Sequence, residues 1–319
     1  MGERVTMRDV AKAVGMSPMT VSRALRDDET VSVRTREKVR KMAQDLGYVY
    51  DSTAQAFRTQ KSGFVAVALP SVNNANFAET FRALTNGLGA AGLQILLGST
   101  NYRVDREEEL VRQLLARNPE ALVLTGGHHT EATRAMVQNR GLPVVEMWDL
   151  PPDPLGHVVG FSNMSAVAPI VDHLARTGRR KLAFVGASEG ADTRGAVRRA
   201  GVEHRARELG LPEVARIDAG PAPVSMRHGH AVIDAMGRAV ADYDALVCVS
   251  DPVAFGCLSA VERMGLRVPD DLAITGFGLF EVAKVANPRL TTVNVGAEAI
   301  GQQVVGLLDG IFRGEIGAP

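Results

Sequence analysis

The chain has 319 residues, of which 45% are hydrophobic and 23% are charged. These fractions exclude a disordered chain, and the length is sufficient for two or three domains with a large core. The formal net charge is zero, but residues 1–62 carry 12 Lys/Arg against 8 Asp/Glu, and the rest of the chain carries 24 against 28. We therefore expect a small basic module joined to a mildly acidic body, a division that suits binding of nucleic acid by the module alone.

No stretch approaches the roughly 18–20 continuous apolar residues of a membrane span, and the N-terminus lacks an apolar signal core. The two cysteines, Cys248 and Cys257, are expected as small buried hydrophobes in a reducing compartment. These features predict a cytoplasmic protein with no membrane partner. There is no Walker loop, Gly-x-Gly-x-x-Gly or His-Glu-x-x-His motif, so we expect no cofactor, no metal and no catalytic residue.

The first fifty residues predict three short helices. Thr6 and Asp9 have capping-box spacing at the start of the first, and its apolar seam consists of Val10, Ala11 and Val14. Gly15 follows at a position that suits a tight turn with positive φ.

The second helix is expected from Ser17 to Leu25. Ser17 suits the N-cap and Pro18 the first helical position, where its missing N–H costs nothing. With 3.6 residues per turn, the inward face of this helix consists of Val21, Ala24 and Leu25. The outward face consists of Pro18, Met19, Ser22 and Arg23. Spacing alone also allows a small helical bundle in which Arg23 and Arg26 are merely solvated.

Ser32 can cap a third helix to about Leu46, with Val39, Ala43 and Leu46 facing the first two helices and Gly47 as its stop. Residues 48–62 are polar and poor in core residues, as in a linker.

From Phe64 onward short apolar runs alternate with helical stretches. We expect strands at 64–69, 93–97, 121–125, 144–147, 181–185, 214–218, 245–249 and 272–275. The helices between them are expected near 77–91, 104–117, 130–139, 164–177, 194–209, 228–240 and 252–264. Near-continuous apolar strands that alternate with helices predict an α/β body with parallel sheets covered on both faces, built as two similar halves.

The ordered residues Thr6-x-x-Asp9-Val-Ala, Gly15, Ser17, Thr20-Val-Ser-Arg23 and Asp45-Leu-Gly-Tyr48 resemble the headpiece signature of the lactose-repressor (LacI) family of bacterial transcription regulators. The layout of the body resembles the two-lobed, periplasmic-binding-protein-like fold of the same family. Val268-Pro-Asp-Asp-Leu272 and Asn287-Pro-Arg-Leu-Thr-Thr292 are typical of its second lobe.

This resemblance covers essentially the whole chain and implies its organisation. It implies a helix-turn-helix headpiece over 1–50, a hinge helix over 51–62 and an effector-binding and dimerisation body over 63–319. Lobe 1 is expected over about 63–161 plus 293–319, and lobe 2 over about 162–292. Residues after Ile311 stop short of a final strand that the family fold leads us to expect.

The resemblance further implies a homodimer on a near-palindromic double-stranded DNA operator, with pairing into tetramers left open. Arg23 would then reach a guanine edge, while Pro18 and Met19 would contact thymine methyl groups. Thr20 and Ser22 would hold phosphates. The candidate DNA-binding residues are Thr6, Ser17, Pro18, Met19, Thr20, Ser22, Arg23 and Phe57.

Phe57 matches the family position whose apolar side chain wedges into the minor groove at the centre of the operator. Packing of Phe57 onto the body is the alternative. The chain departs from the family nearby, with Tyr50 where Pro is usual and Asp51 where Asn is common, which puts the start of the hinge helix in doubt.

Ligands of open parallel sheets bind outside the carboxyl ends of the strands. Family motifs select the effector-binding candidates among the loops there: Asn76, Phe77, His128, Trp148, Arg194, Arg198, Ser250, Asp251 and Gly278. Gly278 stands where sugar-binding members carry an Asp that grips hydroxyl groups. Loss of that acid, with Arg194 and Arg198 kept, favours a ligand with a carboxylate or phosphate.

Met19-Thr-Val-Ser-Arg23, Pro143-Val-Val-Glu146 and Val159-Gly-Phe161 resemble the gluconate-repressor branch of the family, whose effectors are sugar acids. We therefore expect a sugar acid such as gluconate as the small-molecule partner. The alternatives are that the two arginines are surface charge near Glu203 and that His128 with His129 forms a solvated loop pair, which is the simpler interpretation of the histidines.

Two other classes of protein compete with this interpretation. Gly186-Ala-Ser188-Glu-Gly190 follows an expected strand and precedes a helix, as in the nucleophile elbow of a serine hydrolase of α/β fold. A solute-binding protein would share the body fold, but it would need a signal peptide where this chain has a headpiece.

Overall fold

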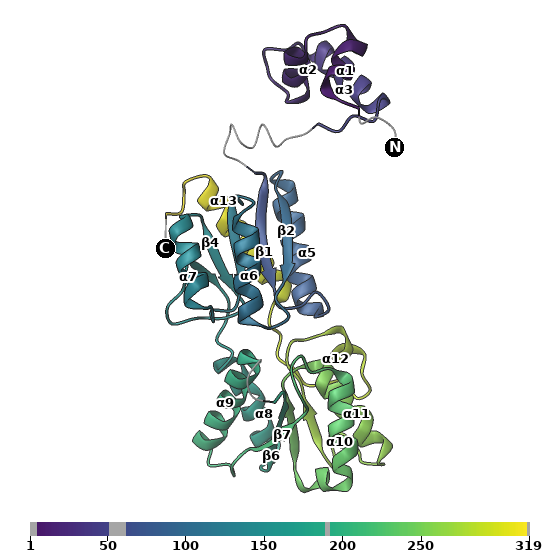
Figure 1. The fold of residues 1–319 in the computed structure, drawn as a ribbon. Coiled ribbons are helices and arrows are strands. Elements are labelled where there is room, and N and C mark those ends of the chain that lie inside the picture. Colours follow the sequence, from purple (N-terminus) through teal and green to yellow (C-terminus); the bar gives the residue numbers. More distant parts are fainter. Residues whose placement is uncertain (1–4, 51–61, 189–191, 318–319) are drawn as a thin grey trace. The chain divides into compact units, whose positions relative to one another are not determined.

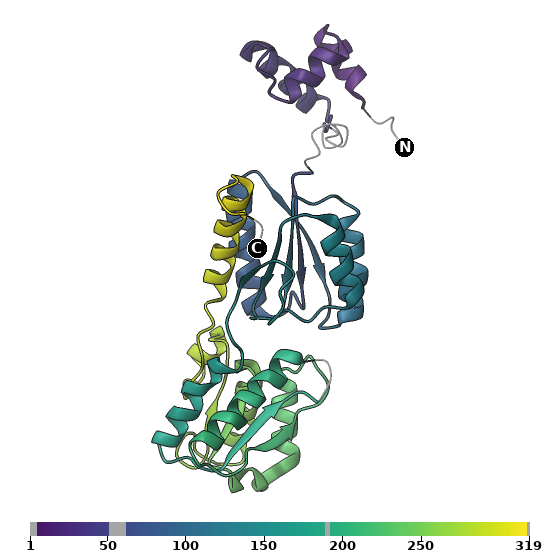
Figure 2. The same cartoon turned by 90° about the vertical axis from the view of Figure 1, so that its left-hand side faces the viewer.

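The fold is described from a computed structural model, which covers residues 5–50, 62–188 and 192–317 (Figures 1 and 2). The chain divides into two compact units, Met1–Ser62 and Gly63–Pro319. The first is called the headpiece and the second the body. Each unit has buried apolar clusters of its own, so each can be described by itself.

The headpiece contains helices α1 (Met7–Val14), α2 (Pro18–Leu25) and α3 (Val33–Asp45). Their first turns are capped as the sequence predicts. Asp9 accepts from both the backbone N–H and the hydroxyl of Thr6 at 2.8 and 2.6 Å, and Ser17 Oγ accepts from the N–H of Thr20 at 3.1 Å. Ser17 satisfies a backbone N–H of the first turn of α2, which has no partner within the helix. Asp9 binds the backbone N–H of Thr6 and thereby fixes how the chain enters α1.

The predicted seams of the three helices form the headpiece core, which includes Val10, Ala11, Val14, Val21, Ala24, Val39 and Ala43. Gly15 turns the chain between α1 and α2 with a φ of +70°. The prediction that Leu46 faces this core is wrong: Leu46 is the C-cap of α3 and is exposed, while Tyr48 packs against the cluster. Leu46 lies at the very end of the helix, where the chain turns at Gly47 and brings Tyr48 against the core.

In the body, β1 (Phe64–Leu69), β2 (Gln94–Ser99), β3 (Ala121–Thr125), β4 (Val144–Met147) and β5 (His157–Val159) form one sheet. The strands run parallel in the order β2-β1-β3-β4-β5. Helices α5 (Ala75–Ala90) and α13 (Ala297–Phe312) cover one face, and α6 (Val104–Leu115) and α7 (Glu131–Arg140) cover the other (Figure 1). These elements constitute the first lobe.

Strand alternation explains both faces of this sheet. Val65, Val67 and Leu69 belong to the cluster under α5 and α13, whereas Ala66 and Ala68 belong to the cluster under α6 and α7. Successive residues of a strand point to opposite faces of the sheet, and here both faces are buried. Consecutive residues can therefore all be apolar. This is why the strands appear in the sequence as continuous apolar runs.

The second lobe repeats the plan with β6 (Leu182–Gly186), β7 (Ala215–Asp218), β8 (Ala245–Cys248) and β9 (Ala273–Thr275) in the order β7-β6-β8-β9, again parallel. Its helices are α8 (Ala168–Arg176), α9 (Thr193–Glu208), α10 (Met226–Met236), α11 (Asp251–Arg263) and α12 (Glu281–Val285). Short 3₁₀ turns lie at Ser165–Val167 and Gly237–Asp242. Both cysteines are buried and unpaired in its core.

Three elements of the body are absent from the sequence prediction: β5, α12 and α13. The two shorter ones, β5 and α12, have only three and five residues. Helix α13 lies far along the chain from the first lobe but packs beside α5, so the last helix of the chain completes the first lobe (Figure 2).

The chain therefore passes between the lobes after β5 and returns before α13. Asn76, at the start of α5, reaches the second lobe directly, since its amide donates to the carbonyl of Gly278 at 3.0 Å. No helix within the described ranges is long and apolar enough to cross a membrane.

Candidate functional site

The outward face of α2 is the first candidate site. Pro18, Met19 and Arg23 are all exposed, and Met19 is 66% exposed although it is apolar. An apolar and a charged side chain that are both exposed on one helix face are suited to contact with a partner. Arg23 forms neither a hydrogen bond nor an ion pair with any residue that the structure describes. Its guanidinium is therefore available to a partner's acceptors.

The polar candidates in the headpiece are already engaged in holding the helices. Ser17 caps α2 and its hydroxyl lies 2.9 Å from that of Thr20, while Thr6 is bound to Asp9. Ser22 and Thr20 are half-buried beside the exposed face. Phe57, the predicted minor-groove wedge, lies outside the described residues, as do Asp51 and the hinge.

The second candidate site is a pair of cavities in the body, of about 300 and 80 Å³. Both are lined by Tyr102 from the first lobe and by Asp192 and Arg194 from the second. They lie at the carboxyl ends of β1, β2 and β3, where Pro70, Thr100 and Thr125 line the larger one. This is the edge at which open parallel sheets bind ligands.

Arg194 and Arg198 bring positive charge to these cavities from the first turns of α9. The guanidinium of Arg194 lies 5.5 Å from the centre of the Phe77 ring, and that of Arg198 lies 3.9 Å from the centre of the Phe277 ring. Arg198 also donates to Asn163 Oδ1 at 2.9 Å and to the carbonyl of Val249 at 3.0 Å. Aromatic faces and these acceptors fix both side chains in place.

Burial lowers the pKa of Arg198 to about 10, so the side chain remains charged at neutral pH. Arg194 forms no ion pair within the described part of the chain. The acids nearby are already used: Asp192 Oδ1 accepts from the N–H of Gly195 at 2.9 Å and caps α9, and Asp149 accepts from the N–H of Leu150 at 3.0 Å. Arg194 therefore faces the cavity together with Asp149 and Asp192, but it forms no ion pair with either of them.

Five predicted effector-binding residues line one or both cavities: Phe77, His128, Arg194, Arg198 and Ser250. Four others line neither cavity, namely Asn76, Trp148, Asp251 and Gly278. Asn76 and Gly278 bind each other across the lobes. Trp148 is buried between Phe77 and Phe161, at 5.1 and 6.1 Å between ring centres.

Asp251 is buried within the second lobe and organises a loop there. Its Oδ2 accepts from the N–H of Phe280 at 2.7 Å, while its Oδ1 has no hydrogen-bond partner among the described residues. Burial raises the pKa of Asp251, against hydrogen bonds that lower it. The side chain fixes the loop that carries Gly278, whose own position leaves no room for a side chain: a Cβ there would meet the Phe280 ring at 2.4 Å and the Asn76 amide at 2.7 Å.

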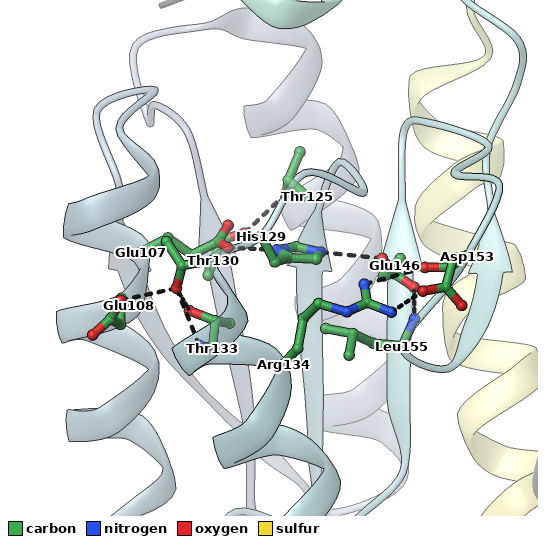
Figure 3. A network of polar contacts seen from close by, with 11 residues as sticks. Glu107, Glu108, Thr125, His129, Thr130, Thr133, Arg134, Glu146, Asp153 and Leu155 are labelled. Carbon is green, nitrogen blue, oxygen red and sulfur yellow. Dashed lines mark hydrogen bonds and ion pairs between the residues drawn. The ribbon is translucent and has the colours of Figure 1, made fainter.

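One polar cluster was missed by sequence reasoning (Figure 3). The side chain of His129 is fully buried, with Nδ1 2.5 Å from Glu107 Oε1 and Nε2 3.1 Å from Glu146 Oε1. The interpretation of His128 and His129 as a solvated loop pair is therefore wrong for His129, although His128 is exposed. Glu107 also lines the larger cavity.

Ser188 does not have the surroundings of a hydrolase nucleophile. Its hydroxyl donates to Asp218 Oδ1 at 2.8 Å instead of to a histidine. A serine nucleophile needs an adjacent base to accept its proton, and an ionised carboxylate already bound to the backbone N–H of Gly220 at 2.8 Å is a poor one. Gly190, the last position of the predicted elbow, lies outside the described residues.

A capped helix-turn-helix unit with an exposed face, joined to a two-lobed body whose cavities are lined by residues of both lobes, defines the class of ligand-responsive DNA-binding regulators. Residues 6–51 match the family model of bacterial regulatory proteins, lacI family, and residues 171–319 match a periplasmic binding protein-like domain. The chain is also similar over nearly its full length to curated members. The protein belongs to the LacI family of DNA-binding transcriptional regulators.

Two of these relatives are regulators named GntR. The one from Pseudomonas aeruginosa is 34% identical over 98% of this chain and 90% of its own length, and the one from Escherichia coli is 33% identical over 99% and 95%. The relatives are transcription regulators, so the hydrolase and solute-binding alternatives are set aside.

Solved structures agree with the fold. A LacI family regulator from Silicibacter pomeroyi is 41% identical over 80% of this chain and 96% of its own, with a TM-score of 0.75. GntR from Chromobacterium violaceum is 34% identical over 79% and 92%, with a TM-score of 0.73. A lac repressor dimer bound to operator, 22% identical over 99% and 95%, has the same fold with a TM-score of 0.83.

Proposed function

We propose that this regulator is a repressor of genes for sugar-acid or other carbohydrate metabolism. It binds a near-palindromic operator as a homodimer, and a sugar acid of the gluconate type in the cavities of the body controls its affinity for that operator. Pairing of dimers into tetramers is not part of the proposal.

The observation that carries the effector assignment is the presence of two arginine side chains at the cavities. Arg194 faces it without an ion-pair partner in the described ranges, and Arg198 has donors left beyond its two bonds. A planar guanidinium binds a carboxylate with two parallel hydrogen bonds. The hydroxyl groups of Thr100, Thr125 and Tyr102, together with the backbone around Gly126 and Gly127, are suited to the polar chain of a sugar acid.

The DNA part rests on the exposed face of α2. In a helix-turn-helix this face enters the major groove, where Arg23 can donate two hydrogen bonds to a guanine edge and Met19 can contact a thymine methyl group. Thr20 and Ser22, at the margin of the face, would hold phosphates, and Ser17 and Thr6 would act by fixing the helices that present it.

The test is a mobility shift with DNA from upstream of the gene, titrated with gluconate and related sugar acids. We expect sequence-specific binding whose affinity changes with one acid, and the direction of the change distinguishes an inducer from a corepressor. Specific binding that no acid alters would overturn the effector assignment. Absence of specific binding, with or without acids, would overturn the proposed DNA-binding face.

A matched pair of variants assigns the response to the cavity. Arg194→Ala removes the positive group and is expected to abolish the response to the acid while operator binding remains. Arg207→Ala removes the same side chain from an exposed position farther along α9, outside both cavities. This control should respond as the wild type does.

A further inference from the structure

Glu107 is a buried acid at the wall of the effector cavity. It lies in the first turns of α6, is only 6% exposed and lines the larger cavity together with Arg194. Its neighbours Glu108 and Glu109 point elsewhere: Glu108 accepts from the hydroxyl of Thr130 at 2.8 Å, and Glu109 is exposed. Of this run of three acids, Glu107 alone lines the cavity.

The two oxygens of Glu107 have different surroundings. Oε1 is bound to His129 Nδ1 at 2.5 Å, whereas Oε2 makes no hydrogen bond within the described part of the chain. Among the described residues, the buried side-chain atoms without a hydrogen bond are Trp148 Nε1 and Asp251 Oδ1, so Oε2 of Glu107 is an unpaired oxygen that solvent reaches. Such an atom beside a cavity is an acceptor that a ligand's donor can satisfy.

His129 holds this carboxylate in place from behind. Its ring lies between Glu107 of α6 and Glu146 of β4, and Oε2 of Glu146 accepts from the N–H of Leu155 at 2.6 Å (Figure 3). Burial lowers the pKa of His129, but the bonds to the two glutamates outweigh it and raise the pKa to about 9. The ring is therefore a cation at neutral pH that donates to both acids.

Charge complementarity then orients the ligand. The anionic end of a sugar acid is attracted to Arg194 and Arg198, and it is repelled by Glu107. The hydroxyl groups at the other end are neutral donors, which a carboxylate binds in charge-assisted hydrogen bonds. The cavity thus has a cationic side for a carboxylate and an acceptor for hydroxyl groups.

We propose that Glu107 is an effector-binding residue that accepts a hydrogen bond from a hydroxyl group of the ligand, and that His129 is the positioning residue that holds the Glu107 carboxylate in its orientation. This inference rests on the proposed function, because it assigns one contact within the same cavity.

The test is calorimetric titration of the full chain with gluconate and with sorbitol, which has the hydroxyl groups but no carboxylate. Glu107→Gln keeps the size of the side chain and removes its charge. We expect it to weaken gluconate binding by about 10- to 100-fold. Glu109→Gln makes the same change at an exposed position of α6 and should bind gluconate as the wild type does.

Two further variants distinguish loss of the Glu107 contact from a folding defect. Glu107→Asp keeps the charge but shortens the side chain, and it should fall between the wild type and Glu107→Gln. His129→Gln removes the cation between two buried acids. Other charges near the ring are already paired, since Arg134 binds Asp153 and Glu108 binds Arg112 at 3.0 Å. Gluconate binding by His129→Gln should therefore weaken, and it should weaken no further when Glu107→Gln is added, because His129 acts only through Glu107.

The outcomes separate this inference from the proposed function. Gluconate binding by Glu107→Gln within twofold of the wild type overturns the role of Glu107 and leaves the sugar-acid assignment standing. Wild-type binding of sorbitol but not gluconate overturns the sugar acid, and a weaker affinity of Glu107→Gln for sorbitol then still supports Glu107. Binding of neither ligand by the wild type overturns both.

Discussion

His129 and Glu107 are 22 residues apart in the chain and lie 2.5 Å apart in the structure. A histidine pair in a loop after a strand has no local pattern that distinguishes solvated rings from buried ones. Glu107 likewise stands in a run of three acids that resembles an exposed helix face. The apolar residues around them revealed the helix and the strand, but the contact between the two depends on how these elements pack.

The raised pKa of His129 predicts a pH-dependent stability of the body. A histidine whose pKa rises on folding stabilises fully below its unfolded value of 6.5 and loses that contribution as the pH rises through about 9. The difference corresponds to about 3 kcal/mol. We expect the free energy of unfolding of the body, measured in urea, to fall by an amount of this order between pH 7 and 10.

His129→Gln provides the comparison for this prediction, because other groups also titrate in this range. The variant should be less stable than the wild type at pH 7, and the difference should shrink as the pH approaches 10. A difference that stays constant over this range would show that the two glutamates do not hold His129 in its charged form.

Arg23 was identified from its spacing in α2, and the structure leaves its guanidinium exposed. If it reads a guanine, Arg23→Ala should weaken operator binding by about 1–3 kcal/mol and reduce the preference for the wild-type base at one position of each half-site. Fluorescence anisotropy with single-base operator variants measures both effects. Arg313→Ala, an exposed arginine of the body paired with Asp309 at 2.7 Å, is the control; equal losses for the two variants would contradict base reading by Arg23.

At the scale of elements, the strands with strong apolar runs were predicted best. Phe64–Leu69 and Ala121–Thr125 agree with the structure at both ends, because burial on both faces makes every residue of a central strand apolar. The three residues of β5 are too few to show a pattern, and they become a strand only because β4 offers an edge. The caps of α1 and α2 were predicted from local chemistry that needs no tertiary contact.

Helix α13 is held against α5 by a close approach that a small residue permits. A Cβ built on Gly301 would lie 2.6 Å from the carbonyl oxygen of Thr80 and 2.7 Å from Ala83 Cβ, whereas one on Gly306 of the same helix would meet no atom within 4 Å. The hydroxyl of Thr80 also donates to the carbonyl of Ala297 at 2.7 Å. The two glycines thus have different roles in one helix.

We expect Gly301→Ala to destabilise the body by about 1–3 kcal/mol, because the two helices must separate to admit the methyl group. Gly306→Ala should instead be neutral or stabilise it by up to about 1 kcal/mol, since alanine favours the helix. Thermal unfolding of both variants measures the contrast. Equal effects would mean that the packing of α13 on α5 is loose.

At the scale of the whole molecule, the two units keep separate cores, and the effector cavity is built from both lobes of the body. Composition revealed the basic headpiece and the acidic body, and the alternation of strands and helices revealed the parallel sheets. Neither could show that the last helix completes the first lobe, which only the family resemblance implied through residues 293–319, or that Asn76 binds the backbone of Gly278. These contacts join residues about 200 positions apart, and they depend on how the chain returns from the second lobe to the first.

Control of the operator by a ligand in the body requires a coupling free energy, and coupling is reciprocal. If gluconate changes operator affinity by some factor, operator DNA must change gluconate affinity by the same factor, typically 5- to 150-fold, or about 1–3 kcal/mol. We expect calorimetry of the full chain with gluconate, with and without saturating operator, to give the factor that the mobility shift gives. Arg194→Ala should abolish both changes together, because it removes the contact through which the ligand acts. Changes that persist in Arg194→Ala would show that the acid acts at a place other than this cavity.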